Sequence, residues 1–410
     1  MVPLIQWRAA RLMALAFLMT VAPACTSGGA SPSPTGSVAP PSPTGSVALP
    51  TPSDTPSPVP TDTPSPTPAV TTSPTPVVTA PPAPTPTHTP APVITPTHAP
   101  SYTLVDLGLV NIVTESGWAG VNATSYVAVA NFRYHSGTKT IVTPAPGQTS
   151  ATVLSINATA QMAGAGCSGD YCHATKWTTP ASARDLGTLG GHQSWSYQIS
   201  DSGIVVGFSN TTGDTTTHAF RQTGTAAMVD LNTVVGSGPT MTLREAWGIN
   251  SSGTIVGWAG ANGSPRAFRL TAAGTLTEVG PLPGMTSGQA RAINVHAHIA
   301  GFSGDGVHVV GWLYNGTTLT AMPTLAGYEL MHPYAINASD IVVGCGRKMS
   351  DDSQVHALRY YGGTVVDLNT FLPGGSSWVL ECATGINDAG TIVGTGRLGT
   401  YNHAFMLVPA

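Results

Sequence analysis

Beyond residue 100, short runs of branched and aromatic residues alternate with Gly, Asn and Ser, and the same order of runs returns along the chain. The clearest copy, residues 383–394, reads ATGINDAGTIVG and is followed by the triplet His403-Ala404-Phe405. Such runs, bounded by turn-forming residues, predict β-strands. Each copy offers four runs, which end in Ile-Asn, Ile-Val-Gly, His-Ala-Phe and Val-Asp-Leu or their equivalents. The repeating unit is therefore predicted to be a small four-stranded sheet.

An Asn, or a Ser in the third copy, ends the first run of every unit. These anchors are Asn122, Asn157, Ser200, Asn250, Asn294, Asn337 and Asn387, and neighbouring anchors are 35 to 50 residues apart. Periods of about 40–45 residues are typical of the four-stranded blade of a β-propeller. The pattern predicts an all-β fold, a seven-bladed propeller over residues 101–410.

The two ends of this region complete each other. Residues 102–108, YTLVDLG, match a fourth strand that no first three strands precede, while the last unit stops after its third strand. A propeller closed by pairing these termini leaves no sheet edge free, whereas an open solenoid has no need of such a pair. We therefore expect strand exchange between the termini.

The units resemble the HAF family of extracellular repeats, which takes its name from the His-Ala-Phe triplet, over essentially all of residues 101–410. The match is specific in the third, fourth, sixth and seventh units and weaker in the first, around Phe132–His135, and in the fifth, around His308–Trp312. The resemblance implies an exported β-repeat domain and carries no established biochemical activity.

The repeated polar residues favour structural roles over chemistry. Asn followed three residues later by Gly is typical of a hairpin turn, whereas a calcium loop requires several carboxylates that most copies lack. One His per blade places these rings too far apart to share an ion, so we expect hydrogen bonds between neighbouring strands instead, at His173, His218, His356 and His403. No metal site and no cofactor are predicted.

The N-terminus reads as an export signal. Arg8 and Arg11 precede the apolar run Leu12–Val21, and Ala22-Pro23-Ala24 leads to Cys25. We interpret residues 1–24 as a signal peptide, of lipoprotein or ordinary type. Acylation of Cys25 would then provide the only attachment to a membrane, because no apolar segment is long enough to span one. The alternative is free secretion.

An exported protein is expected to form disulfides, because it meets an oxidising environment. With Cys25 set apart, Cys167 and Cys172 flank one hairpin loop, and Cys345 and Cys382 pair by elimination.

Residues 25–100 consist almost wholly of Pro, Thr, Ser, Ala, Gly and Val, a composition that cannot bury a core. We predict a disordered, extended stalk that carries the propeller away from a cell surface.

Composition and motifs argue against several classes of function. Charged residues make up 8% of the chain and the 15 Lys and Arg residues are scattered, which argues against a nucleic-acid partner. No nucleophile elbow, metalloprotease helix or phosphate-binding loop occurs, so no catalytic residue is assigned. The acidic residues Asp305, Asp351 and Asp352 fall in polar loops, where solvated turn residues are the usual case.

One further pattern suggests a binding site. Aromatic residues occur shortly before the predicted first strand of several blades. They are Trp118, Trp195, Trp247, Tyr334 and Trp378. Flat aromatic faces suit sugar or peptide contacts, although packing between blades is the alternative. The resulting hypothesis is a surface-tethered, non-catalytic binding or adhesion module for polysaccharide or a surface protein. A glycan-active hydrolase or lyase and a purely structural envelope protein are the alternatives.

Overall fold

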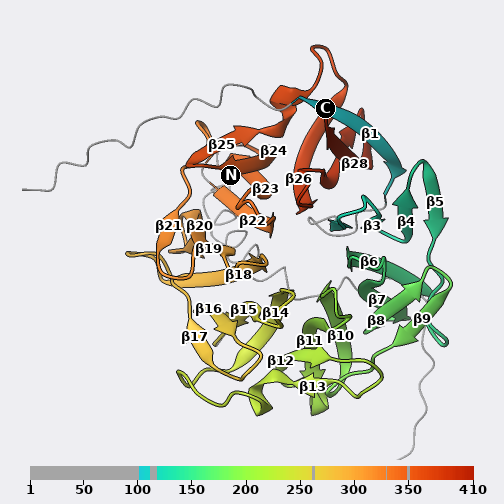
Figure 1. Ribbon diagram of the computed structural model, residues 1–410, viewed down its shortest axis with the longest axis vertical. Coiled ribbons are helices and arrows are strands. Elements are labelled where there is room, and N and C mark those ends of the chain that lie inside the picture. Colours follow the sequence, from blue (N-terminus) through green and yellow to red (C-terminus); the bar gives the residue numbers. More distant parts are fainter. Residues whose placement is uncertain (1–100, 111–117, 261–263, 329, 349–350) are drawn as a thin grey trace, which may run out of the picture. The chain divides into compact units, whose positions relative to one another are not determined.

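The computed structural model describes residues 101–110, 118–260, 264–328, 330–348 and 351–410 of the protein. The predicted signal peptide, Cys25 and the Pro-rich segment lie outside these ranges. Within them, seven blades of four antiparallel strands follow one another in a ring (Figure 1). The predicted all-β, seven-bladed propeller is confirmed. No helix of the described ranges has the length and apolar character needed to cross a membrane.

Six blades take their strands in chain order. The first holds β2 (Ala119–Val121), β3 (Val127–Val129), β4 (Phe132–His135) and β5 (Thr138–Ile141), and the second holds β6 (Ser150–Ile156), β7 (Met162–Ser168), β8 (Tyr171–Thr179) and β9 (Ser182–Asp185). The third holds β10 (Gly190–Ile199), β11 (Val205–Thr211), β12 (Thr217–Gln222) and β13 (Val229–Asp230), with the 3-10 turns η1 (Thr212–Asp214) and η2 (Leu231–Thr233).

The fourth blade holds β14 (Leu243–Ile249), β15 (Ile255–Ala259), β16 (Arg266–Leu270) and β17 (Leu276–Glu278). The fifth holds β18 (Ser287–Ile293), β19 (Ile299–Gly304), β20 (Val309–Tyr314) and β21 (Leu319–Ala321). The sixth holds β22 (Leu330–Ile336), β23 (Val342–Lys348), β24 (Asp351–Tyr361) and β25 (Thr364–Asp367), followed by η3 (Leu368–Phe371). A single parallel pair, Val309 with Leu330, joins the fifth and sixth sheets.

The seventh blade combines both ends of the region. Its inner strands are β26 (Trp378–Ile386), β27 (Ile392–Leu398) and β28 (Tyr401–Pro409), and its outer strand is β1 (Tyr102–Leu109). The β1–β28 ladder runs from Tyr102 opposite Pro409 to Leu109 opposite His403. The expected closure between termini is confirmed.

The His-Ala-Phe triplet is explained by what each of its side chains contacts. The His is hydrogen-bonded through Nδ1 to the carboxylate of an Asp on the fourth strand, as in His173 with Asp185 at 2.9 Å and His403 with Asp106 at 2.9 Å. The Ala and Phe are fully buried where they occur, as Ala404 and Phe405 are. These contacts confirm the expected bonds between neighbouring strands, and the last of them crosses the closure.

The Gly of Ile-Val-Gly is required because the second strand at this position lies too close to the first strand to leave room for a side chain. A Cβ on Gly257 would lie 1.9 Å from the carbonyl oxygen of Glu245 and 2.9 Å from the Phe268 ring. Gly394 meets the carbonyl of Cys382 and the Phe405 ring in the same way. The second strand therefore lies directly against the innermost strand, and the Phe fills the space that a side chain would need.

The anchor Asn residues do more than close a turn. In the last blade, Asn387 Oδ1 accepts the backbone N–H of Thr391 at 2.9 Å, which confirms the predicted turn. Its Nδ2 donates to the carbonyl oxygen of Asn122 in the first blade at 2.9 Å. Equivalent bonds run from Asn122 to Asn157, Asn157 to Ser200, Asn250 to Asn294, Asn294 to Asn337 and Asn337 to Asn387. We call this series the amide ring.

The amide ring is interrupted at one step. The hydroxyl of Ser200 closes its own turn by accepting the N–H of Ile204 at 3.1 Å, but it does not extend to Asn250. The third and fourth blades are linked instead through Gln198, whose Oε1 accepts the N–H of Ile249 at 2.7 Å.

Completing the ring should stabilise the fold. Ser200→Asn supplies an amide whose Nδ2 can donate to the carbonyl of Asn250, and we expect a gain of about 1 kcal/mol in the free energy of unfolding. Asn337→Ala should cost about 1–3 kcal/mol, because it leaves buried backbone groups without partners. Urea denaturation measures both. Ser200→Ala is the control, and a gain from that variant equal to the gain from Ser200→Asn would contradict the proposed bond.

Candidate functional site

A β-bulge at the same place in the first strand of six blades turns one side chain out of the ladder. In β14, for example, Ala246 pairs with Gly257 and Gly248 pairs with Val256, so that Trp247 is left between them. The bulged residue stands three positions before the anchor in each case: Leu154, Tyr197, Trp247, Arg291, Tyr334 and Thr384. Bulges re-aim side chains. Thr384 is bonded to the backbone of Ala119 in the first blade, and the other five side chains are directed toward the propeller axis.

Aromatic rings from blades that are not neighbours meet there. Trp118, which precedes the first blade, stacks on Trp247 of the fourth with ring centroids 5.3 Å apart. It also meets Tyr197 of the third blade at 6.0 Å and the edge of Tyr334 of the sixth at 5.4 Å. Tyr197 and Trp247 are stacked at 4.0 Å. Contacts between the first, third, fourth and sixth blades are possible only near the axis. We call these four aromatic residues, together with Arg291 and Glu245, the axial cluster.

The axial cluster contains two buried charged groups. Among the described residues, Glu245 and Arg291 are the only acidic or basic side chains less than a tenth exposed, at 1% and 3%. The hydroxyl of Tyr197 donates to Glu245 Oε2 at 3.2 Å, and the Arg291 guanidinium lies 3.8 Å from the centre of the Trp247 ring. Burying charge is costly, so charges retained at such a position point to a functional role.

Burial also shifts the pKa values of two side chains near the axis, Glu245 and His332. Burial raises the pKa of Glu245 to about 7, although the charge of Arg291 and hydrogen bonds from Trp258 and Tyr197 oppose that shift. Shielding from water, together with the charges of Arg291 and Arg347, lowers the pKa of His332 to about 3. A neutral imidazole and a carboxyl that titrates near neutrality therefore lie on strands that reach the axis.

The structure separates the five aromatic residues singled out from the sequence. Trp118, Trp247 and Tyr334 belong to the axial cluster, and half-buried Trp195 packs at its edge beside Phe208. Trp378 lies apart, with its ring edge-on to His403 at 5.6 Å. Sequence reasoning missed Tyr197, Arg291 and Glu245. The constant offset of three residues from the anchor could have identified the first two.

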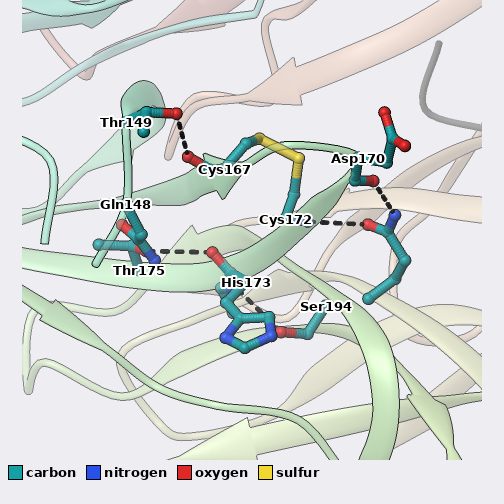
Figure 2. The surroundings of a disulfide bond; sticks show 10 residues. Gln148, Thr149, Cys167, Asp170, Cys172, His173, Thr175 and Ser194 are labelled. Carbon is teal, nitrogen blue, oxygen red and sulfur yellow. Dashed lines mark hydrogen bonds between the residues drawn. A yellow bond between two sulfur atoms is a disulfide. The ribbon is translucent and has the colours of Figure 1, made fainter. Parts of the chain in front are cut away.

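Both predicted disulfides are present. Cys345 of β23 is bonded to Cys382 of β26, which links the sixth and seventh blades beside Tyr334 and Trp118. Cys167 is bonded to Cys172 across the tip of the β7–β8 hairpin (Figure 2). In the described ranges, no group of three or more His, Cys, Asp or Glu side chains is arranged to hold a metal ion.

The first strand of every blade begins on one side of the ring, which we call the leading face. Because strands alternate in direction within a blade, the loops between second and third strands lie on this face as well. Trp118 directly precedes β2, and Trp195 lies five residues before its anchor in β10, so both lie nearer the leading face than the amide ring does. The amide ring, where the first strands end, lies toward the opposite face.

No protein-family model matches the sequence, and neither does any curated protein. Among solved structures, the fold is similar to a catalytically inactive virginiamycin B lyase from Staphylococcus aureus, crystallised with quinupristin. That match has 16% identity and a TM-score of 0.47, and it covers 75% of this chain and all of the other. The RRP9 WD40 repeats match with 13% identity and a TM-score of 0.47, over 76% and 99% of the two chains. Neither likeness bears on ligand or activity.

The raised pKa of Glu245 predicts a pH-dependent stability. Folded protein binds this proton more tightly than unfolded protein, whose carboxyl titrates near 4.5, so stability falls as the pH rises from 4.5 through about 7. We expect Glu245→Gln to reduce the difference in unfolding free energy between pH 4.5 and pH 8 by about 3 kcal/mol.

Urea denaturation at the two pH values measures this difference. The matched control is Glu278→Gln, because Glu278 is an exposed carboxylate of the same blade. The pH profiles of the two variants should differ. Identical profiles would show that Glu245 does not titrate in this range.

Proposed function

We propose that the protein is a carbohydrate-binding module, exported and tethered to the cell surface, that binds neutral polysaccharide at the axial cluster. The observation that carries this proposal is the meeting of Trp118, Tyr197, Trp247 and Tyr334 at the axis. Aromatic faces pack against the apolar faces of sugar rings and leave the hydroxyl groups to polar neighbours.

Exposure distinguishes the residues that can contact a ligand from those that support them, in the axial cluster and at its edge. Trp118, Trp195 and Phe208 are half-buried and present the surface that a ligand reaches, whereas Trp247 and Tyr334 are buried and hold them in place. Trp247 also carries an indole N–H that is buried without an acceptor among the described residues. Because the surrounding residues shield this N–H, Trp247 supports the contact surface and does not itself meet the ligand.

Charge favours a neutral ligand. At neutral pH the positive charge of Arg291 is partly offset by Glu245, whose pKa lies at about 7, so the axis carries less than one unit of net charge and gives little attraction for an ionic polymer. The protein alternative, a surface protein as partner, would present a peptide to the same aromatic residues. The binding experiment below separates the two.

The N-terminal region supports the location. The signal peptide expected at residues 1–24, acylation of Cys25 and the Pro-rich stalk of residues 25–100 together describe a domain held at a distance from a membrane. Membership of the HAF repeats, suggested by the triplets, fits the same setting. Two disulfides are also in keeping with an oxidising compartment.

A glycan-active enzyme is the second candidate, and Glu245 favours it. A buried carboxyl with a pKa of about 7 has the protonation behaviour of a general acid, the role that hydrolysis of a glycosidic bond requires. Tyr197 and Arg291 would position and modulate that carboxyl.

Binding should depend on the aromatic residues at the axis. With intact protein tested against laminarin, xylan, galactomannan and peptidoglycan glycan strands, we expect Trp195→Ala and Trp118→Ala to weaken retention of the bound polymer roughly tenfold each. Affinity electrophoresis measures retention on the soluble polymers, and co-sedimentation measures it on the insoluble strands.

Trp378→Ala is the matched control, because Trp378 is equally half-buried and lies outside the cluster. Its retention should equal that of wild type. Failure of every polymer to bind, or equal loss in all three variants, would refute the carbohydrate site. Binding of a peptide array in place of the polymers would favour the surface protein.

The enzyme hypothesis has its own test. Incubation of wild-type protein with the same polymers should release reducing or unsaturated ends, and Glu245→Gln should lower that rate by roughly a hundredfold or more. Chromatography of the products decides between the hypotheses. The absence of product from wild type would leave the binding module as the function.

A further inference from the structure

An exposed tyrosine outside the axial cluster is held in place by unusually many constraints. Tyr171 lies in the β7–β8 hairpin of the second blade, is 52% exposed and directly follows the turn Gly169-Asp170. The disulfide between Cys167 and Cys172 staples the hairpin immediately around it (Figure 2). Exposed loop tips are ordinarily mobile, so a covalent staple here restricts a side chain that does not contribute to the core.

The neighbouring blade adds a second constraint. Gln193 at the start of β10 accepts the N–H of Cys172 at 3.2 Å through Oε1 and donates to the carbonyl of Asp170 at 2.9 Å through Nε2. One amide side chain thus fixes both ends of the short segment that bears Tyr171. The hairpin of the second blade and the first strand of the third blade are clamped together on the leading face.

The ring of Tyr171 is also supported on one side. His192 stacks against it with centroids 4.8 Å apart and an interplanar angle of 30°. His192 is fixed in turn, because its Nδ1 is hydrogen-bonded to Asp214, which also accepts the backbone N–H of His192 at 2.8 Å. These bonds, with a further one from Asn210, lower the pKa of Asp214 to about 2, so the carboxylate that holds the imidazole is ionised at neutral pH.

We propose that Tyr171, His192 and Asp170 form an outer subsite for a pyranose unit of the polysaccharide chain that reaches the axial cluster. The free face of the tyrosine ring provides the stacking surface. The exposed Asp170 carboxylate and the second ring nitrogen of His192 provide hydrogen-bonding groups for sugar hydroxyls. This inference rests on the proposed function, which supplies the ligand class.

Three observations favour a sugar over another occupant. The aromatic ring is rigid and half exposed, which gives contact area at a small entropic cost. Its polar neighbours are a carboxylate and an imidazole, with no described Lys or Arg bonded to them, so an anionic ligand has no counterpart. His192 lies in the irregular start of β10, three residues before Trp195 and nearer the leading face, so one extended chain can contact both places.

An outer subsite makes a prediction about chain length. For intact protein and the oligosaccharides of whichever panel polymer is bound, Tyr171→Ala should weaken binding of the hexasaccharide about tenfold and leave binding of the disaccharide unchanged. Trp195→Ala should weaken both. Isothermal titration calorimetry with the laminarin, xylan or mannan oligomers measures these affinities.

The chain offers matched controls. Tyr401 occupies the equivalent loop of the seventh blade and is 67% exposed, so Tyr401→Ala removes an exposed tyrosine without touching the subsite. Tyr171→Phe keeps the stacking surface and should retain most of the wild-type affinity for the hexasaccharide. Replacing Cys167 and Cys172 by Ser keeps Tyr171 but frees its loop, and should weaken hexasaccharide binding several-fold.

The outcomes separate this inference from the function on which it rests. If Tyr171→Ala behaves like Tyr401→Ala while Trp195→Ala still weakens binding, the outer subsite is refuted and the axial site stands. If Tyr171→Ala weakens the disaccharide as much as the hexasaccharide, Tyr171 belongs to the primary site and the subsite is again refuted. If no oligosaccharide binds wild-type protein, both proposals fail.

Discussion

The amide ring is the interaction on which the rest of the propeller depends. Where each first strand ends, the carbonyl of its anchor faces the preceding blade and has no ladder partner on that side. The side-chain amide of the preceding anchor fills this need, and the bond from Asn387 to Asn122 carries the series across the chain termini. One Asn side chain thus accepts the N–H groups of its own turn and adds a second bond to the carbonyl of the next anchor, so the Asn recurs although the residues around it vary. One residue type thereby sets both the turn within a blade and the distance between blades.

With the anchors fixed, the bulge three residues earlier becomes a position where the sequence is free to change. Its side chain lies outside the ladder, so Leu154, Tyr197, Arg291 and Thr384 occupy equivalent places without altering the sheets around them. The scaffold therefore separates folding residues from residues available for recognition. Arg291 is one of these bulged residues, whereas Glu245 lies within the ladder opposite Trp258, and the first strands of other blades fold without either charge.

Much of the fold could be predicted because its signals are local. The blade number follows from the seven anchors, and the closure follows from an Asp-Leu-Gly strand at the beginning of the region that matches the strand missing at its end. The His bonds followed from position within the repeat, the Cys167–Cys172 bond from its place around one hairpin loop, and the Cys345–Cys382 bond from elimination. The second bond of each Asn could not be predicted, because its acceptor lies in a neighbouring blade.

The site was only partly predictable: Trp118, Trp247 and Tyr334 were identified as aromatic residues, but Trp378 shares their chemistry and lies elsewhere. Glu245 carries no signal in the sequence that distinguishes it from a solvated carboxylate, because its burial arises from strands of two blades.

The closure also determines how the domain would bear a load. β1 is antiparallel to β28 and starts at Tyr102, on the face of the ring opposite the leading face. A pull on Ser101, resisted by a ligand held at the leading face, acts along β1 and therefore at right angles to its hydrogen bonds with β28. All the pairs from Tyr102 to Leu109 would share that shear force at once, and none could open before the others as in a zipper. The seam that completes the ring is thus oriented to resist tension from its own N-terminal end.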